Sequence, residues 1–285
     1  MSKNNQNKFG YKPSFSILII RFLVSFLQKI LFLNKDNIFS NEFAQSLSLK
    51  KIINFDGKKI IFRTGHGRLK WRADSFFEEE PLMIEWIRSF SKEDIFLDIG
   101  ANVGIYTIAA LSKNCKVYSV ELDPKNVSIL FDNLYLNKFF DNCLVLPFAI
   151  GDTNKIEKIY YRDFSVGDAL QSIGKETQLP TITGKKFYAH QMIFDLDQIF
   201  KQFSLVYPTK VKIDVDGNEK IVIEGAKDII SNCNEIYIED NGLENDSYII
   251  NFLNNNNFTE YKKMPINKEM KNNKIYNRLF RKNKK

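Results

Sequence analysis

Cysteine and histidine are scarce in this chain of 285 residues, which has three cysteines and two histidines. The cysteines lack C-x-x-C spacing, and each lies in or beside an apolar stretch typical of a strand. We expect buried free thiols in a reducing compartment rather than disulfides or zinc ligands. The histidines, His66 and His190, stand far apart in the sequence, which also argues against zinc. The cysteines are Cys115, Cys143 and Cys233.

The chain also lacks the G-x-G-x-x-G pattern with which dinucleotide-binding proteins hold a pyrophosphate. A strand–turn–helix signal is nevertheless present, because the apolar run Ile95–Ile99 leads into Gly100 and Gly104 and then into a helical pattern. Such a unit forms a ligand crevice at the carboxyl end of a parallel strand. We expect Gly100 to let the backbone approach the ligand without a Cβ in the way. The alternative is that both glycines serve packing alone.

Two acids beside this crevice point to a positively charged ligand. Asp98 precedes the turn, where a carboxylate would repel phosphate but suits an ammonium or sulfonium group. Glu121 follows the second expected strand, Lys116–Val120, and a carboxylate at that position commonly accepts hydrogen bonds from ribose hydroxyls. Together with the two glycines, these acids predict S-adenosylmethionine as the ligand.

Strand and helix patterns alternate along residues 91–285, which favours an α/β fold with a mostly parallel sheet and helices on both faces. No internal repeat is visible. An extra hairpin is expected near Tyr160. The expected strands are 95–99, 116–120, 143–150, 211–215, 235–239, 258–263 and 273–280, and the expected helices are 103–112, 126–137, 193–203, 219–230 and 249–253.

The part before residue 91 has a different character. Asp56-Gly57 between two apolar alternations, 51–55 and 59–63, indicates a hairpin. Residues 74–90 predict one amphipathic lid helix capped by Asp74. We therefore divide the chain into an N-terminal extension (1–45), the hairpin and lid helix (46–90) and the α/β domain (91–285).

The two ends of the chain bear on membrane contact. In the apolar segment 14–33, a spanning helix would place Arg21 near mid-bilayer, which costs about 3 kcal/mol. No small-residue cleavage site follows, as a signal peptide would require. A helix in the membrane interface, or one packed on this domain or a partner, suits Arg21 and Lys29 better. Residues 262–285 hold ten basic residues and one acid, which suits an anionic membrane surface or nucleic acid, or else a frayed, solvated terminus. We expect a cytoplasmic protein that can lie at the inner face of the membrane.

Three sequence blocks indicate a family. Residues 96–104 read FLDIGANVG, residues 120–124 read VELDP, and residues 211–219 read VKIDVDGNE. Over residues 74–280 the chain resembles the FkbM-type family of S-adenosylmethionine-dependent, class I methyltransferases. The resemblance implies a seven-stranded Rossmann-like sheet, adenosylmethionine as methyl donor, and O-methylation of a hydroxyl on a sugar or secondary metabolite. The chain departs from the usual family pattern at Asp216, where Glu is usual, and at Asn218, where Ala is common.

The donor site follows from these motifs. Backbone groups of the glycine turn are expected to hold the methionine part, Glu121 the ribose, and the end of the third strand the adenine. The residues expected to bind the donor are Asp98, Gly100, Ala101, Asn102, Gly104, Glu121, Leu122, Asn142, Ala149 and Ile150.

Methyl transfer to a hydroxyl benefits from a general base, and four residues are candidates for this or for positioning the acceptor. Asp214 ends the fourth strand and should face the crevice. Glu219 lies in the next helical turn, where it could instead complement the helix N-terminus. Glu239 ends the fifth strand, where a capping or turn role is the alternative. His190 titrates near neutrality, although a surface histidine is the commoner case.

The chemistry needs no obligatory metal. Four acids, Asp195, Asp197, Asp214 and Asp216, could gather a hard cation such as magnesium. The sequence fixes no geometry for them, so we predict no metal site.

Three classes of function remain open from the sequence. The leading one is O-methylation of a small molecule, glycan or lipid-linked saccharide. A nucleic-acid methyltransferase is suggested by the positive charge, but the chain lacks the Pro-Pro-aromatic tetrapeptide of amino-methylating enzymes, and we do not expect a nucleic-acid partner. A non-catalytic protein that binds the donor as a scaffold is the third. The oligomeric state cannot be derived from the sequence.

Overall fold

The computed structural model describes residues 49–174, 187–240, 246–265 and 275–283, together with Leu18, Ile19, Phe22, Leu23, Ser25 and Phe26. These six residues are helical and exposed. The rest of the apolar segment 14–33 lies outside the described residues. Within the described part of the chain, no helix is long and apolar enough to cross a membrane.

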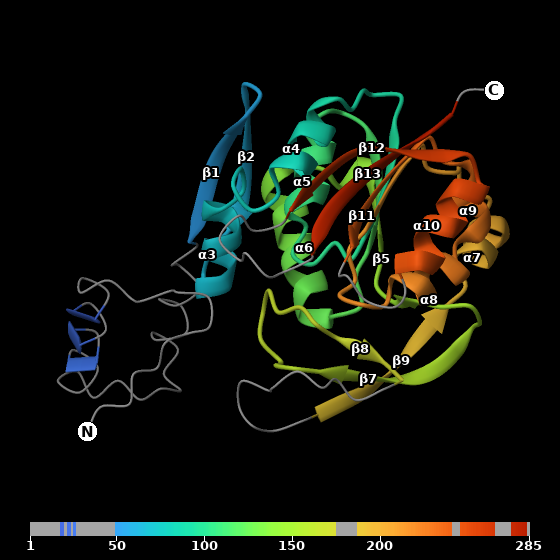
Figure 1. Ribbon diagram of the computed structural model, residues 1–285. Coiled ribbons are helices and arrows are strands. Elements are labelled where there is room, and N and C mark those ends of the chain that lie inside the picture. Colours follow the sequence, from blue (N-terminus) through green and yellow to red (C-terminus); the bar gives the residue numbers. More distant parts are fainter. Residues whose placement is uncertain are drawn as a thin grey trace.

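Seven strands form the central sheet. They are Ile95–Ile99 (β3), Lys116–Val120 (β4), Cys143–Leu146 (β5), Lys210–Ile213 (β10), Glu235–Asp240 (β11), Phe258–Pro265 (β12) and Tyr276–Lys282 (β13). Their order is β12-β13-β11-β10-β3-β4-β5 (Figure 1). The five strands from β11 to β5 pair in parallel, whereas β13 runs antiparallel to both β11 and β12.

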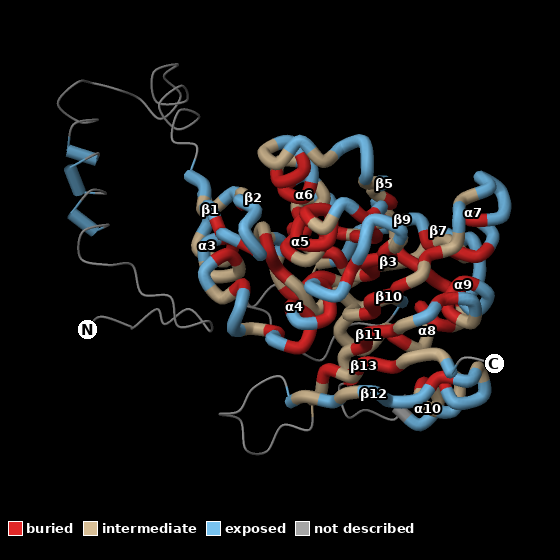
Figure 2. Tube along the Cα trace, turned by 90° about the horizontal axis from the view of Figure 1, so that it is seen from above, coloured by how far each residue is buried: buried red, intermediate tan, exposed pale blue. Residues whose placement is uncertain are grey.

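Helices cover both faces of this sheet (Figure 1). One face packs against Pro81–Arg88 (α4), Ile105–Leu111 (α5) and Pro124–Asn137 (α6). The other packs against Leu196–Gln202 (α7), Glu219–Glu224 (α8), Lys227–Asn232 (α9) and Asp246–Asn255 (α10). Side chains alternate along a strand, so Phe96 enters the first core and Leu97 the second. Figure 2 shows buried residues along β3, β10 and β11, between the two helical layers. The predicted Rossmann-like α/β fold, with a mostly parallel seven-stranded sheet and helices on both faces, is confirmed.

The predicted hairpin is confirmed as Lys50–Phe55 (β1) and Lys58–Arg63 (β2), joined by a turn at Asp56 and Gly57. The prediction of a single lid helix over residues 74–90 is wrong. Two helices replace it, Gly67–Asp74 (α3) and α4, and Asp74 is the last residue of α3 rather than a cap. Ser75 closes α3 because its N–H and Oγ both donate to the Trp71 carbonyl. Pro81 starts α4, where a missing N–H costs no helical hydrogen bond.

A second, four-stranded sheet lies at the bottom of the view in Figure 1. It consists of Ala149–Ile150 (β6), Lys155–Tyr161 (β7), Ser172–Ile173 (β8) and Phe187–Phe194 (β9), in the order β6-β9-β7-β8. The third strand, expected over 143–150, therefore splits into β5 and β6, because Pro147 has no N–H to donate to a ladder. The helix expected from residue 193 begins later, because Ile193 still belongs to β9. Asp195 caps α7 by accepting from the Gln198 N–H at 2.9 Å.

Two further expectations about the second half need correction. The helix over 219–230 is broken at Gly225, whose position against the Gly151 carbonyl leaves no room for a Cβ (2.0 Å). Five of the ten basic residues near the C-terminus belong to β12 and β13 rather than to a frayed tail, and the other five lie outside the described residues. Three of the five form ion pairs: Lys262 with Glu85, Arg278 with Asp240, and Arg281 with Glu235.

Candidate active site

A cavity of about 310 Å³ opens where β3, β4, β10 and β11 reach their carboxyl ends. Parallel sheets of this kind bind ligands at that edge. Six of the ten expected donor residues line the cavity, and four do not. The six are Gly100, Asn102, Glu121, Leu122, Ala149 and Ile150.

Glu121 lies in the cavity wall, directly after β4, and is 6% exposed. Its Oε2 accepts from the Asn102 N–H at 2.7 Å, and its Oε1 accepts from the Asp123 N–H at 2.7 Å. Burial raises the pKa of this carboxyl to about 7, against the lowering effect of the two N–H groups. A carboxylate has about four acceptor positions, so the two backbone donors leave room for two hydroxyls of a ligand. The same side chain therefore anchors the glycine turn and offers acceptors to the cavity.

Gly100 is required for a reason that the sequence does not reveal. Its φ is +78°, and a Cβ there would lie 1.9 Å from the Asp214 carbonyl oxygen. The backbone after β10 thus excludes a side chain at this position. The Asp214 N–H also donates to the Ile99 carbonyl at 3.2 Å, which joins the two strand ends that form the cavity floor.

Asp98 lies beneath the turn and not at the cavity wall. It is fully buried, accepts from Thr107 Oγ1 at 2.7 Å, and has Lys212 Nζ 3.4 Å from its Oδ1. Its position at the fourth residue of β3 points the side chain to the α5 face of the sheet. Asp98 therefore touches the cavity only through its neighbours, Thr107 and Lys212.

Three other expected donor residues also lie outside the wall. Ala101 is buried in the turn. Gly104, with φ +82°, precedes α5, and a Cβ there would meet Leu130 Cδ1 at 2.3 Å. Asn142 ends the short 3-10 helix Phe140–Asn142 and is exposed.

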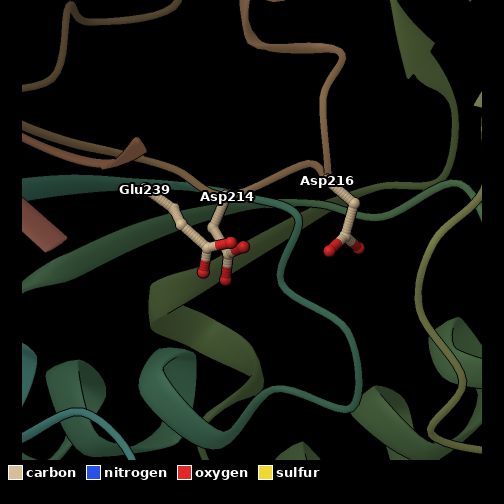
Figure 3. Close-up of side chains that lie close together, drawn as sticks. All are labelled: Asp214, Asp216 and Glu239. Carbon is tan, nitrogen blue, oxygen red and sulfur yellow. The ribbon is translucent and has the colours of Figure 1, made fainter. Parts of the chain in front are cut away.

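Asp214, Asp216 and Glu239 come together in the wall, each offering an oxygen within 4.8 Å of the others. Figure 3 shows the carboxylates of Asp214 and Glu239 side by side, with Asp216 further along the loop that begins at Asp214. Burial, and next the charge of Asp214, raise the pKa of Glu239 to about 10 and that of Asp216 to about 6. The site can thus hold protons that a positively charged ligand would displace.

The other candidate bases do not reach this group. Glu219 is 3% exposed behind the wall, where it accepts from the Gly217 N–H at 2.9 Å, and burial raises its pKa to about 7. His190 lies on the exposed face of β9, outside the cavity wall, with its ring edge against Tyr188. Asp195 and Asp197 serve α7 and α9, where Asp197 accepts from the Asp228 and Ile229 N–H groups, so the four-aspartate cation site does not form.

The segment before the domain contributes wall residues that the sequence did not reveal. Glu79 and Glu80 reach the cavity from the start of α4. Glu80 accepts from Tyr237 Oη at 2.8 Å, Tyr106 Oη at 3.0 Å and Asn277 Nδ2 at 3.3 Å. Burial, and next the charge of Asp214, raise its pKa to about 7. Only the packing of α4 on β11 and β13 brings these acids to the site.

A second group of unforeseen wall residues comes from α3 and the small sheet: Arg68, Trp71, Arg72 and Arg162. Arg68 pairs with Asp163 at 3.3 Å and with Asp168 at 3.0 Å. Arg162 also pairs with Asp168, whereas Arg72 donates to the Gly167 carbonyl at 3.2 Å. An aromatic ring and several hydrogen-bond donors thus line the same cavity as the acids.

The family comparison agrees with this geometry. The model for the Methyltransferase FkbM domain matches residues 98–260, which is more than half of the chain. The chain belongs to the FkbM methyltransferase family.

Among similar proteins, the hexuronic acid methyltransferase AglP of Haloferax volcanii is 22% identical over 172 residues, or 59% of this chain and 65% of that protein. The tRNA (guanine(37)-N(1))-methyltransferase of Dictyostelium discoideum is 34% identical over 81 residues, or 28% of this chain and 17% of that protein. The chain therefore spans less than two thirds of the length of either relative. The crystal structure of the methyltransferase FkbM from Methylobacillus flagellatus is 16% identical, with a TM-score of 0.48 over 84% of this chain and 57% of that one.

Proposed function

We propose that this FkbM-family chain is an S-adenosylmethionine-dependent O-methyltransferase that acts on a hydroxyl of a sugar, glycan or related metabolite. The observation that carries the proposal is the Glu121 carboxylate, which is held by two backbone N–H groups and faces a cavity rich in carboxylates. Diols bind well to such an acceptor, and the surrounding acids suit a positively charged molecule.

The residues present fit this donor. Glu121 would hold the ribose, the backbone at Gly100 and Asn102 the methionine part, and Leu122, Ala149 and Ile150 the adenine. When bound, the donor supplies an electrophilic methyl group to the acceptor oxygen. The protein must then align that oxygen and receive its proton, and alignment alone can be worth several kcal/mol.

Glu239 is the best placed general base. It lies in the wall beside Asp214, and the structure records no hydrogen bond or ion pair between it and another described residue. Its raised pKa keeps it protonated in the empty cavity at neutral pH. Positive charge in the cavity lowers the pKa of a carboxyl, so Glu239 would become able to accept a proton only when the donor is present.

Other wall residues suit a saccharide acceptor. Trp71 offers an aromatic surface, and Gln171 and Asn218 offer amide oxygens, since their amide nitrogens donate within the protein. The name of the Haloferax volcanii relative points to the same class of acceptor. We include free and lipid-linked saccharides in the proposal, and contact of the N-terminal segment with an anionic membrane surface stays a prediction.

Methylation of tRNA is a second candidate, favoured by the local similarity to the Dictyostelium discoideum enzyme. The described basic side chains of β12 and β13 offer it little support, because Lys262, Arg278 and Arg281 are paired with carboxylates.

Calorimetric titration with S-adenosylmethionine and with NAD, followed by transfer of labelled methyl groups to monosaccharides, lipid-linked saccharides and tRNA, tests the proposal. We expect binding of the first ligand only, and label on a saccharide. Label on tRNA would favour the second candidate, and donor binding without any transfer would favour a scaffold. Glu239→Gln should lower turnover by about 100-fold or more, whereas His190→Ala should retain it because this side chain lies outside the cavity wall.

A further inference from the structure

Lys212 is a buried lysine below the cavity floor, with 1% of its side chain exposed. Its Nζ lies 3.0 Å from Asp214 Oδ2 and 3.4 Å from Asp98 Oδ1, and it donates to the Gly100 carbonyl at 3.3 Å. One ammonium group therefore connects β3, the glycine turn and the acid that follows β10.

The lysine belongs to a row of polar side chains that crosses the buried α5 face of the sheet. Lys212 is in register with Asp98 on one side and Tyr237 on the other, and Asp98 is in register with Ser119. Buried ion pairs often stabilise a protein no more than apolar residues of similar size would. Stability alone thus gives a weak reason for this row, and its position under the cavity suggests a second role.

Of the two acids paired with Lys212, Asp214 is the one that lines the cavity. Its side chain is 24% exposed in the cavity wall, next to Glu239 and Asp216. Neighbouring carboxylates oppose each other's ionisation, and a nearby cation favours it. Lys212 keeps its own charge: burial lowers its pKa, but Asp214, Asp98 and Glu80 raise it above its usual value.

We infer that Lys212 is a positioning residue that holds the Asp214 carboxylate in place at the wall and thereby strengthens binding of the sulfonium donor relative to its product, S-adenosylhomocysteine. This inference rests on the proposed function. The two ligands share every group except one methyl and the positive charge on sulfur. The ratio of their dissociation constants consequently reports on charge at the wall, whereas damage to the turn weakens both.

The test compares Lys212→Met with a matched control, Lys210→Met. Lys210 lies on the same strand and the same face, is 8% exposed, and pairs with Glu235 at 2.8 Å, but it lies at the opposite end of β10 from the cavity. Both variants lose a buried ion pair. By calorimetry, we expect Lys212→Met to lose about tenfold more affinity for S-adenosylmethionine than for S-adenosylhomocysteine, and Lys210→Met to keep the wild-type ratio.

Two further variants distinguish an effect on the ligand site from a folding defect. Lys212→Met with Asp98→Asn removes the carboxylate that would be left unpaired, so stability in urea should recover while the affinity ratio stays lost. Asp214→Asn, with Lys212 intact, should change the ratio in the same direction. Equal losses for both ligands in the Lys212 variants, or a wild-type ratio in Asp214→Asn, would overturn the inference. Failure of the wild-type protein to bind either ligand would instead refute the proposed function.

Discussion

Replacing Glu121 by glutamine should weaken donor binding and, at the same time, remove a cost to the stability of the empty protein that grows with pH. The folded protein raises the pKa of Glu121 from its usual value near 4.5 to about 7, chiefly through burial. A raised carboxyl pKa means that the folded state binds the proton more tightly than the unfolded chain does. The stability of the wild-type protein therefore falls as the pH rises from about 4.5 to about 7 and changes no further above that range.

The magnitude follows from the pKa difference. One pKa unit corresponds to about 1.4 kcal/mol, so ionising Glu121 costs the folded state about 3 kcal/mol above neutral pH. Glutamine cannot ionise, and its shape resembles that of the protonated acid. The amide nitrogen of glutamine cannot accept from the second backbone N–H, so we expect Glu121→Gln to be less stable than the wild type by about 1–3 kcal/mol at about pH 5. The lost ionisation cost should offset this difference by about 2–3 kcal/mol at about pH 8. Donor affinity should fall by about 10- to 100-fold, because one neutral oxygen replaces two charged acceptors.

Urea unfolding at both pH values and calorimetry with S-adenosylmethionine measure these effects. Glu219→Gln is the matched control, because Glu219 is also buried and has its pKa raised to about 7 but lies behind the wall. It should show a similar change in relative stability between the two pH values, with little loss of donor affinity. The reasoning is refuted if Glu121→Gln binds the donor as tightly as the wild type, or if both variants lose affinity equally.

Three other outcomes follow from the same geometry. Gly100→Ala should lower the free energy of unfolding in urea by about 3 kcal/mol or more, because a Cβ there would lie 1.9 Å from the Asp214 carbonyl oxygen. Gly57→Ala, also at positive φ but with open space around the Cβ, should lower it by only about 1 kcal/mol. Equal losses would contradict the packing argument. Tyr237→Phe should cost about 1–3 kcal/mol, since it removes a buried hydroxyl that donates to Glu80; an unchanged unfolding midpoint would argue against this bond. Donor binding at about pH 8 should release protons, because positive charge lowers the pKa of Glu239; binding enthalpies that do not vary between phosphate and Tris buffers would exclude this release.

The sequence predicted the parts of the structure that depend on local patterns. β3 and β4 were located to the residue, because apolar strands that end at a glycine turn or an acid carry a sharp signal. The hairpin at Asp56 and Gly57 was equally clear. Errors arose where a single residue interrupts a longer apolar pattern, as Pro147 does between β5 and β6 and Gly225 does between α8 and α9.

The same distinction between local patterns and distant contacts applies to the candidate site. Glu121, Asp214 and Glu239 were found because each ends a strand at the edge where parallel sheets bind ligands. Glu80 and Lys212 could not be assigned a role, because their partners lie on other elements: Glu80 contacts residues 26, 157 and 197 positions away. The packing constraint on Gly100 could not be predicted, because the Asp214 backbone that excludes a Cβ follows it by more than a hundred residues in the chain.

A crystal structure of the protein with S-adenosylhomocysteine tests the central claim most directly. The account predicts ribose hydroxyls within about 2.5–3.0 Å of the Glu121 carboxylate, with the sulfur on the side of Asp214 and Glu239. A ligand bound elsewhere, or a ribose that makes no contact with Glu121, would contradict it.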